Sequence, residues 1–161
     1  PIIISLGIGF EMSFIDRIFD ISNKYGNCLS FMHCNNAYPT PIEDAGIGIV
    51  RRLSQDSRHK WGLSDHTESP LTPALAVAAG AKIIEKHFTL SRDMYGSDAK
   101  NSMEPEEFCK LVKEIKNAWL ARGKVNYGSV ASENSALSRR SLYIVRDMKK
   151  GDILTPETYD Q

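Results

Sequence analysis

Apolar positions in the first 123 residues alternate between the spacing of buried strands and that of amphipathic helices. Short, continuous apolar runs predict four strands, at residues 2–8, 28–34, 61–64 and 83–88. After each strand, apolar residues recur at helical spacing and predict helices around residues 14–21, 40–53, 73–79 and 104–119. A strand–helix unit repeated four times is typical of a parallel α/β fold, either an open sheet or a closed barrel.

The ends of the predicted helices carry recognisable signals. Thr40 and Pro41 predict an N-cap followed by proline at the first position of the second helix. The last helix opens with acidic residues, which favour the positive end of the helix dipole, and we expect Gly123 to close it. The first strand, with three consecutive isoleucines, is expected to be covered on both faces.

The apolar period disappears after residue 123. Residues 124–140 are rich in small, polar and charged side chains and predict a linker. A new strand is predicted at residues 141–145, followed by a turn at Lys150-Gly151-Asp152. We interpret residues 141–161 as the start of a second, β-rich domain. Because the chain begins with Pro1 directly inside a strand of the buried type, we expect it to be a piece of a longer polypeptide.

Composition narrows the class of protein. Of 161 residues, 42% are apolar and 25% charged, which is ordinary for a globular protein. Twenty basic residues balance twenty acidic ones, which disfavours a nucleic-acid binder. No apolar run approaches the roughly 20 residues of a membrane-spanning helix, so no membrane partner is expected. Three cysteines at unpatterned spacings predict reduced thiols and a cytoplasmic location.

Polar side chains gather directly after the second, third and fourth predicted strands, at residues 33–38, 64–67 and 85–89. The carboxyl ends of parallel strands meet at one edge of a sheet, and the loops there converge on one crevice. We therefore expect the functional site at this edge.

His66 and His87 are the sharpest candidates. They lie 21 residues apart, about one crossover, so both can reach the same rim on neighbouring strands. Two imidazoles would suit a divalent metal, although histidines satisfied by backbone hydrogen bonds are an equally open alternative. Glu85 shares a strand face with His87 and is our candidate catalytic residue, as a hydrogen-bond partner of that histidine. A solvated or ion-paired glutamate fits this position equally well.

The consecutive residues Ser64, Asp65 and His66 contain the residue types of a catalytic triad. Neighbouring residues of a strand point to opposite faces, so these three cannot relay a proton to one another. We therefore do not interpret them as a triad.

Five blocks of sequence resemble the sialic acid synthase family. They are HCNNAYPTPIED (residues 33–44), GLSDHT (62–67), IEKHFTL (84–90), GSD (96–98) and SMEP (102–105). Their order and spacing match those of the family. Two weaker blocks, RSLY (140–143) and KGDILT (150–155), resemble the entry to that family's antifreeze-like (SAF) domain.

The resemblance implies a fold and an organisation. Residues 1–123 would be the second half of a (β/α)8 TIM barrel with four βα units, residues 124–140 a linker, and residues 141–161 the first strand of an incomplete SAF domain. The full-length enzyme would be a cytoplasmic homodimer.

The resemblance also implies an activity, the metal-dependent condensation of phosphoenolpyruvate with an N-acylated amino sugar such as N-acetylmannosamine. The products would be a nine-carbon sialic acid and phosphate. Mn²⁺ or Mg²⁺ would bind the aldehyde of the sugar, with His66 and His87 as its ligands. The substrate-binding residues would be Asn36 and Ser64 for phosphoenolpyruvate, with Ser5 as a further contact to its phosphate, and Tyr38 and Asp98 for the amino sugar.

The chain also departs from the family. Its first strand has Ser5-Leu6-Gly7-Ile8 where the family usually has Ser-Thr-Gly-Met, and the segment before Asp98 differs from the common Pro-Gly-Pro-Asp. The lysines and glutamate of the family's first half-barrel are not in this sequence. Two alternatives therefore stay open: a relative that makes legionaminic or pseudaminic acid, and a non-catalytic fragment that has no turnover of its own.

Overall fold

The computed structural model describes residues 2–25, 29–123 and 142–160. The chain divides into two compact units, Pro1–Gly123 and Lys124–Gln161, and each is described by itself. The predicted linker, residues 124–140, lies outside the described residues, as do Gly26 and Cys28. None of the helices in the described part of the chain is long and apolar enough to cross a membrane.

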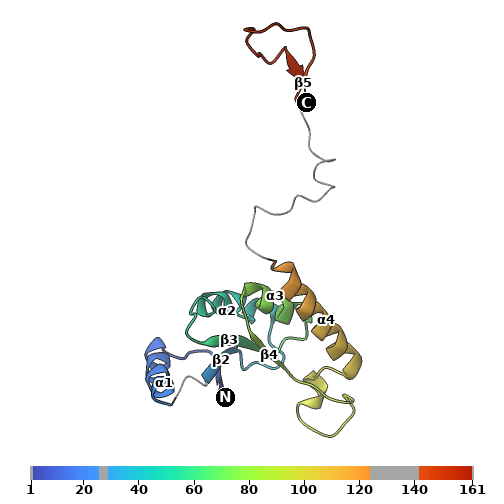
Figure 1. The fold of residues 1–161 in the computed structure, drawn as a ribbon. Coiled ribbons are helices and arrows are strands. Elements are labelled where there is room, and N and C mark those ends of the chain that lie inside the picture. The colour runs from blue at the N-terminus through green and yellow to red at the C-terminus, as the bar shows by residue number, and fades with distance from the viewer. Residues whose placement is uncertain (1, 26–28, 124–141, 161) are drawn as a thin grey trace. The chain divides into compact units, whose positions relative to one another are not determined.

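The first unit is a parallel sheet of four βα units. The strands β1 (Ile2–Leu6), β2 (Leu29–Cys34), β3 (Lys60–Asp65) and β4 (Ile83–Lys86) pair in that order. They are followed by the helices α1 (Met12–Lys24), α2 (Ile47–Leu53), α3 (Leu71–Ala79) and α4 (Pro105–Ala121). The helices follow one another along one side of the sheet (Figure 1). The predicted parallel α/β repeat is confirmed.

Alternate residues of each strand face the helices and form the core. On β2 and β3 these residues include Phe31 and Trp61, which pack with Phe19 of α1. Further along β3, Leu63 packs with Val50 of α2 and Ala76 of α3. The residues between them point to the opposite face of the sheet, the one that carries the polar strand-end residues. We call these two sides the helix face and the open face.

The strand β1 is less covered than its sequence predicts. The side chains of Ile2 and Ile3 are 56% and 52% exposed, so the expectation of burial on both faces is wrong. Among the described residues β1 pairs only with β2, which leaves its other edge without a partner. The three isoleucines indicate a buried strand, but among the described residues nothing covers Ile2 and Ile3.

The second helix begins later than predicted. Thr40 does not cap it, because its hydroxyl donates to the carbonyl of Ala37 at 2.8 Å. A short 3₁₀ helix, η1 (Ile42–Asp44), comes first, and α2 begins only after Gly46. Gly46 has a φ of 70°, in the left-handed region that glycine tolerates. The proline signal therefore marks a turn of 3₁₀ helix.

The last helix begins and ends as its sequence predicts. Glu104 and Glu107 form a capping box around Pro105, and Gly123 follows the helix with a φ of 59°. The long loop before it contains a second 3₁₀ helix, η2 (Ala99–Asn101). Within this loop Arg92 donates to Glu107 at 2.6 Å and ties the loop to the first turn of α4.

An apolar groove of about 670 Å³ runs along the free edge of β4. It lies between α3 and α4 and is lined by residues that include Val77, Ile84, Phe108, Val112 and Trp119. We call it the α3–α4 groove. Together with the exposed isoleucines of β1, it shows that the sheet has apolar surface at both of its edges.

The second unit contains a small antiparallel pair of strands. β5 (Tyr143–Ile144) pairs with β6 (Tyr159–Asp160). The predicted turn is present, since the N–H of Asp152 donates to the carbonyl of Lys149 at 3.1 Å. The strand at β5 is shorter than predicted.

Candidate active site

Three side chains from different loops and strands meet at the carboxyl end of the sheet. The hydroxyl of Tyr38 lies 2.8 Å from Nε2 of His66 and 3.3 Å from Nε2 of His87. The ring of Tyr38 stacks on that of His66, and the centroids of the two imidazoles are 5.2 Å apart. The convergence of these candidates, which the sequence predicts from strand ends alone, is therefore observed.

The orientation of the His66 ring is fixed by its other nitrogen. Nδ1 lies 2.6 Å from the carbonyl oxygen of Asn35, which can only accept a hydrogen bond. Nδ1 therefore carries the proton, and Nε2 of the neutral ring keeps a lone pair that faces Tyr38. Nε2 accepts a hydrogen bond from the Tyr38 hydroxyl in this arrangement.

The environment of Tyr38 keeps its hydroxyl protonated. Burial of the hydroxyl, followed by the nearby charges of Cys34, Asp98 and Glu85, raises the pKa of Tyr38 above its usual value. Tyr38 therefore acts as a hydrogen-bond donor at neutral pH. Its side chain is 48% exposed, so it is accessible to a bound molecule.

Glu85 does not contact His87 as the sequence suggests. Its carboxylate accepts a hydrogen bond of 2.7 Å from the hydroxyl of Ser64, its register partner on β3. Among the described residues, no hydrogen bond joins Glu85 to His87, so the predicted pairing is wrong. The two-residue period places both residues on the open face, but the hydroxyl of Ser64 on the neighbouring strand β3 is the donor that Glu85 accepts from.

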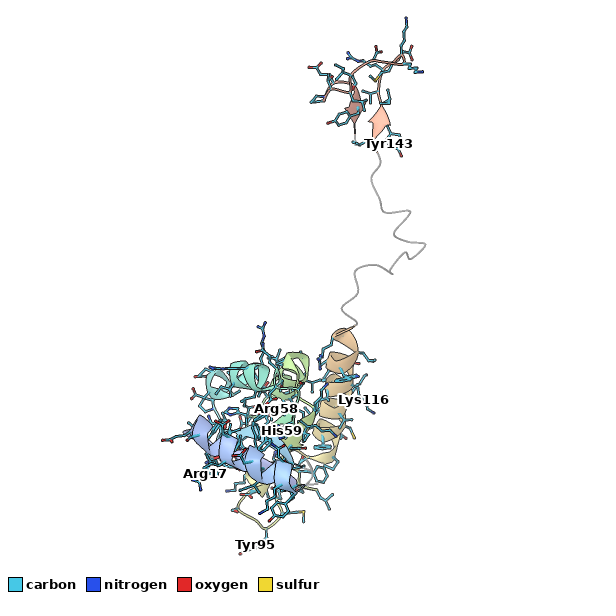
Figure 2. The ribbon with its side chains drawn as sticks, turned by 60° about the vertical axis from the view of Figure 1, so that its left-hand side comes forward. Arg17, Arg58, His59, Tyr95, Lys116 and Tyr143 are labelled. Carbon is cyan, nitrogen blue, oxygen red and sulfur yellow. The ribbon has the colours of Figure 1, made fainter. Side chains whose placement is uncertain are left out.

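Asp98 approaches the site from the loop that follows β4. Its carboxylate oxygen Oδ2 lies 3.9 Å from Nδ1 of His87. A pocket of about 340 Å³ opens there, and its lining includes His87, Tyr95 and Asp98. Tyr95 is fully exposed and projects from the loop (Figure 2). The pocket is large enough for a sugar-sized ligand beside His87.

Of the remaining candidates, Ser64 lies near the cluster, with its hydroxyl 3.5 Å from Nε2 of His66, whereas Asn36 and Ser5 form no hydrogen bond to the three clustered side chains among the described residues. Asn36 accepts a weak hydrogen bond of 3.5 Å from the thiol of Cys34 and lies against Gly7. Ser5 lies on the open face of β1, beside Met32 of β2, with no hydrogen bond to the other candidates in the described part of the chain. Ser64, which is 3% exposed, lies beside Cys34 in the sheet.

Asp65 faces away from its two neighbours. Its carboxylate accepts a hydrogen bond of 2.7 Å from the ammonium of Lys86, and both side chains are almost fully buried. Lys86 also donates to the carbonyl of Thr67. The expectation that Ser64, Asp65 and His66 form no triad is confirmed, because Asp65 is committed to an ion pair on the helix face.

Sequence reasoning missed Asn35 and Lys86. Asn35 orients His66 through its carbonyl, and backbone groups leave no signal in a sequence. Lys86 could have been found from the strand period, since it faces the helices at a position where only a paired charge is stable.

The positions of the two histidine rings are compatible with binding a divalent metal. Both Nε2 atoms face the same point, the hydroxyl of Tyr38, and the bond from Nδ1 of His66 gives its Nε2 a lone pair that could bind a metal in place of the Tyr38 proton. No group of three or more histidine, cysteine, aspartate or glutamate side chains forms a complete site among the described residues. Water and substrate oxygens would therefore have to complete the coordination.

Comparison with known proteins places the chain in a family. A family model described as the NeuB family matches residues 1–127. The chain belongs to the NeuB family. It is 38% identical over 160 residues to the pseudaminic acid synthase of Campylobacter jejuni, covering 98% of this chain and 46% of that protein. It is 36% identical over 165 residues to the N,N'-diacetyllegionaminic acid synthase of Legionella pneumophila, covering 98% and 46%.

The fold of this NeuB-family chain is also found in a solved structure. The crystal structure of the N-acetylneuraminic acid (sialic acid) synthetase of Leptospira borgpetersenii matches 84% of this chain and 47% of that one. The TM-score is 0.75 at 34% sequence identity. The α/β fold with its parallel sheet is therefore similar to that of sialic acid synthases. The chain spans about half the length of the curated relatives it matches.

Proposed function

We propose that this chain is the carboxyl-terminal half of the barrel of a sialic-acid-type synthase. The complete enzyme condenses phosphoenolpyruvate with an N-acylated amino sugar, N-acetylmannosamine or a similar hexose, and releases phosphate. The observation that carries this proposal is the meeting of Tyr38, His66 and His87 at the carboxyl ends of the strands. Membership of a family whose relatives are named as synthases of nine-carbon sugar acids supports it.

In the proposed reaction, C3 of phosphoenolpyruvate forms a carbon–carbon bond to the aldehyde carbon of the open-chain sugar. Water adds to C2, and the C2–O bond to phosphate breaks. Tyr38 and Asp98 hold the amino sugar beside His87; the 340 Å³ pocket supports the place of Asp98, and the contact of the Tyr38 hydroxyl with His87 supports that of Tyr38. Asn36, Ser64 and Ser5 contact phosphoenolpyruvate, and Glu85 orients the hydroxyl of Ser64.

A divalent cation held by His66 and His87, Mn²⁺ or Mg²⁺, would supply polarisation of the aldehyde carbonyl. The two histidines themselves orient their Nε2 atoms toward one point, and Asn35 holds one of the rings in place. The Tyr38 hydroxyl, which faces Nε2 of His66, stays protonated because its pKa is raised, and it would donate a hydrogen bond to an oxygen of the bound sugar.

The proposed half-barrel accounts for the two apolar edges of the sheet. Ile2 and Ile3 of β1 and the α3–α4 groove are covered when a preceding half-barrel pairs with β1 and β4. The second unit, with β5 and β6, is the start of an SAF domain in this proposal. The complete enzyme is a cytoplasmic homodimer.

The test is an assay of the complete enzyme together with the isolated chain. The complete enzyme, with its upstream half, releases phosphate from phosphoenolpyruvate in the presence of N-acetylmannosamine and Mn²⁺. The isolated 161-residue chain is expected to give no turnover and to dimerise, aggregate or stay partly molten. A monodisperse, cooperatively melting monomer that forms product would refute the half-barrel proposal.

A second candidate function is the synthesis of pseudaminic or legionaminic acid. The 38% and 36% identity to synthases named for these products favours it. Product analysis with each candidate hexose separates the two, because only the accepted sugar yields a new nine-carbon acid. Phosphate release with none of the hexoses would instead support the non-catalytic alternative.

A further inference from the structure

The Nδ1 atom of His66 has one hydrogen-bond partner among the described residues, a backbone carbonyl. Nδ1 donates to the carbonyl of Asn35 at 2.6 Å, which leaves Nε2 as the nitrogen that faces Tyr38 and His87. If this carbonyl turned away, the proton could move to Nε2, and the lone pair would then point away from the site. The tautomer of His66 therefore depends on the orientation of one peptide group.

The side chain of Asn35 fixes that peptide group. Asn35 is 9% exposed, and both ends of its amide are hydrogen-bonded. Its Oδ1 accepts from the backbone N–H of Ala37 at 3.0 Å, and its Nδ2 donates to the carbonyl of Asp44 at 3.1 Å. These bonds tie the turn after β2 to the 3₁₀ helix η1. The carbonyl of Asn35 is thereby left free to accept from His66.

A second set of bonds ties the same turn to the backbone of His66. The N–H of Thr40 donates to the carbonyl of His66 at 2.9 Å, and the hydroxyl of Thr40 donates to Ala37 at 2.8 Å. The ring and the backbone of His66 thus both contact the segment from Asn35 to Thr40. This segment also carries Tyr38, which lies against the two imidazoles.

We propose that Asn35 is a positioning residue of the synthase, which holds His66 in the tautomer that presents Nε2. Partners of metal-bound histidines act in this way, and their loss typically costs about 10–100-fold in metal affinity. The consequence for metal affinity rests on the proposed function. The tautomer of His66 is a property of the chain itself and can be measured without metal.

The experiment uses the complete enzyme with its upstream half, labelled with ¹⁵N-histidine and free of metal. The ring-nitrogen chemical shifts report the tautomer of His66, and titration calorimetry reports the Kd for Mn²⁺. Asn35→Ala removes both side-chain bonds, whereas Asn35→Asp keeps the acceptor for Ala37. Asn117→Ala, at an exposed asparagine of α4, is the matched control.

The parent and Asn117→Ala are expected to show His66 protonated at Nδ1. Asn35→Ala is expected to show a mixture of tautomers and a Kd for Mn²⁺ raised about 10–100-fold, with Asn35→Asp between them. At saturating Mn²⁺ the kcat of Asn35→Ala recovers. If Asn35→Ala fails to fold, the comparison of Asn35→Asp with the control decides.

An unchanged tautomer and an unchanged Kd for Mn²⁺ in the Asn35 variants would overturn the proposal, even if their Tm fell, since that is the result of a purely structural role. Failure of the proposed function gives a different result. In that case His66→Ala binds Mn²⁺ as well as the parent does, while Asn35→Ala still changes the tautomer of His66.

Discussion

The two faces of the sheet use histidine in opposite ways. On the helix face, His33 is 2% exposed, and neither of its ring nitrogens has a hydrogen-bond partner among the described residues. His59 comes directly before β3 and stacks on Phe19 at 4.0 Å between centroids. Burial lowers the pKa of both imidazoles, although the charge of Asp56 partly opposes this for His59. These two rings act as neutral packing groups.

On the open face, His66 and His87 are less buried, and their nitrogens lie within reach of polar partners. His66 contacts Asn35 through Nδ1 and Tyr38 through Nε2, and His87 faces Tyr38 and Asp98. The comparison shows that a histidine can bind a metal or a substrate only where its ring nitrogens lie next to polar groups or accessible space. Position in the sequence after a strand does not decide it, since His33 and His66 both lie near strand ends.

The largest expected effect is the loss of either open-face histidine. His66→Ala and His87→Ala, in the complete enzyme, should lower activity more than about 100-fold, since loss of a mere partner of a ligand costs up to that amount in metal affinity. The fold should be retained, because neither ring belongs to the core clusters. Phosphate release in Mn²⁺, beside circular dichroism, measures both effects. Activity equal to that of the parent in either variant contradicts the assignment.

On the helix face, a substitution beside a histidine is expected to lower stability and not activity. Gly46 has a φ of 70°, and a Cβ added there would lie 2.1 Å from Nε2 of His33. Gly46→Ala should therefore lower the free energy of unfolding of the complete enzyme by at least about 2 kcal/mol. Gly48→Ala is the control: Gly48 lies inside α2 with open space around it, so alanine should stabilise by about 0.5–1 kcal/mol. Urea unfolding of both variants measures the difference.

On the open face, two substitutions distinguish the residues assigned to the amino sugar from those assigned to phosphoenolpyruvate. Tyr38→Phe removes a hydroxyl placed on the amino sugar, and a lost hydrogen bond of about 0.5–1.5 kcal/mol raises the KM for that substrate about 2- to 10-fold. Ser64→Ala should raise the KM for phosphoenolpyruvate instead. Initial rates of the complete enzyme with each substrate varied in turn give the two values. The reverse pattern would show that the two binding regions are exchanged.

The smallest effect is expected for His59→Phe, which tests whether a histidine on the helix face makes stability depend on pH. The folded-state pKa of His59 is lowered, so the unfolded chain binds the proton more readily, and stability falls as pH drops through about 6.5. The fall is at most about 1.4 kcal/mol per pH unit for one histidine. Phenylalanine keeps the stack on Phe19 without titrating. Urea unfolding between pH 7.5 and 5 should show a shallower fall for the variant, with unchanged activity at pH 7.5.

The sequence alone predicts the order of strands and helices, because each unit carries its own periodic pattern. It also predicts that Tyr38, His66 and His87 meet, since the carboxyl ends of parallel strands share one edge. It cannot predict that Glu85 bonds to Ser64, because that bond depends on the register between β3 and β4. The same limit applies to Asn35, whose contribution to His66 comes from a backbone carbonyl.

The helix boundaries show a second limit. Thr40 and Pro41 have the residue types of an N-cap. In the structure, however, the hydroxyl of Thr40 donates to the carbonyl of Ala37, and its N–H donates to the carbonyl of His66. The prediction that β1 is buried was also wrong. Apolar residues show that a strand is suited to burial, but they do not show whether a neighbour covers it. Ile2 and Ile3 remain exposed where that contact is missing from the described residues.

The order of the strands has a consequence for biosynthesis. Each strand pairs with the one just before it in the chain, as in Ile3 with Ser30, Phe31 with Trp61 and Leu63 with Ile84, so partners are 27, 30 and 21 residues apart. At about 5–20 residues per second, each new strand leaves the ribosome about 1–6 s after its neighbour. Within the four-stranded sheet of the described residues, every pair joins strands that are consecutive in the chain. The sheet can therefore be assembled during translation, one βα unit after another, in the order in which the ribosome releases them.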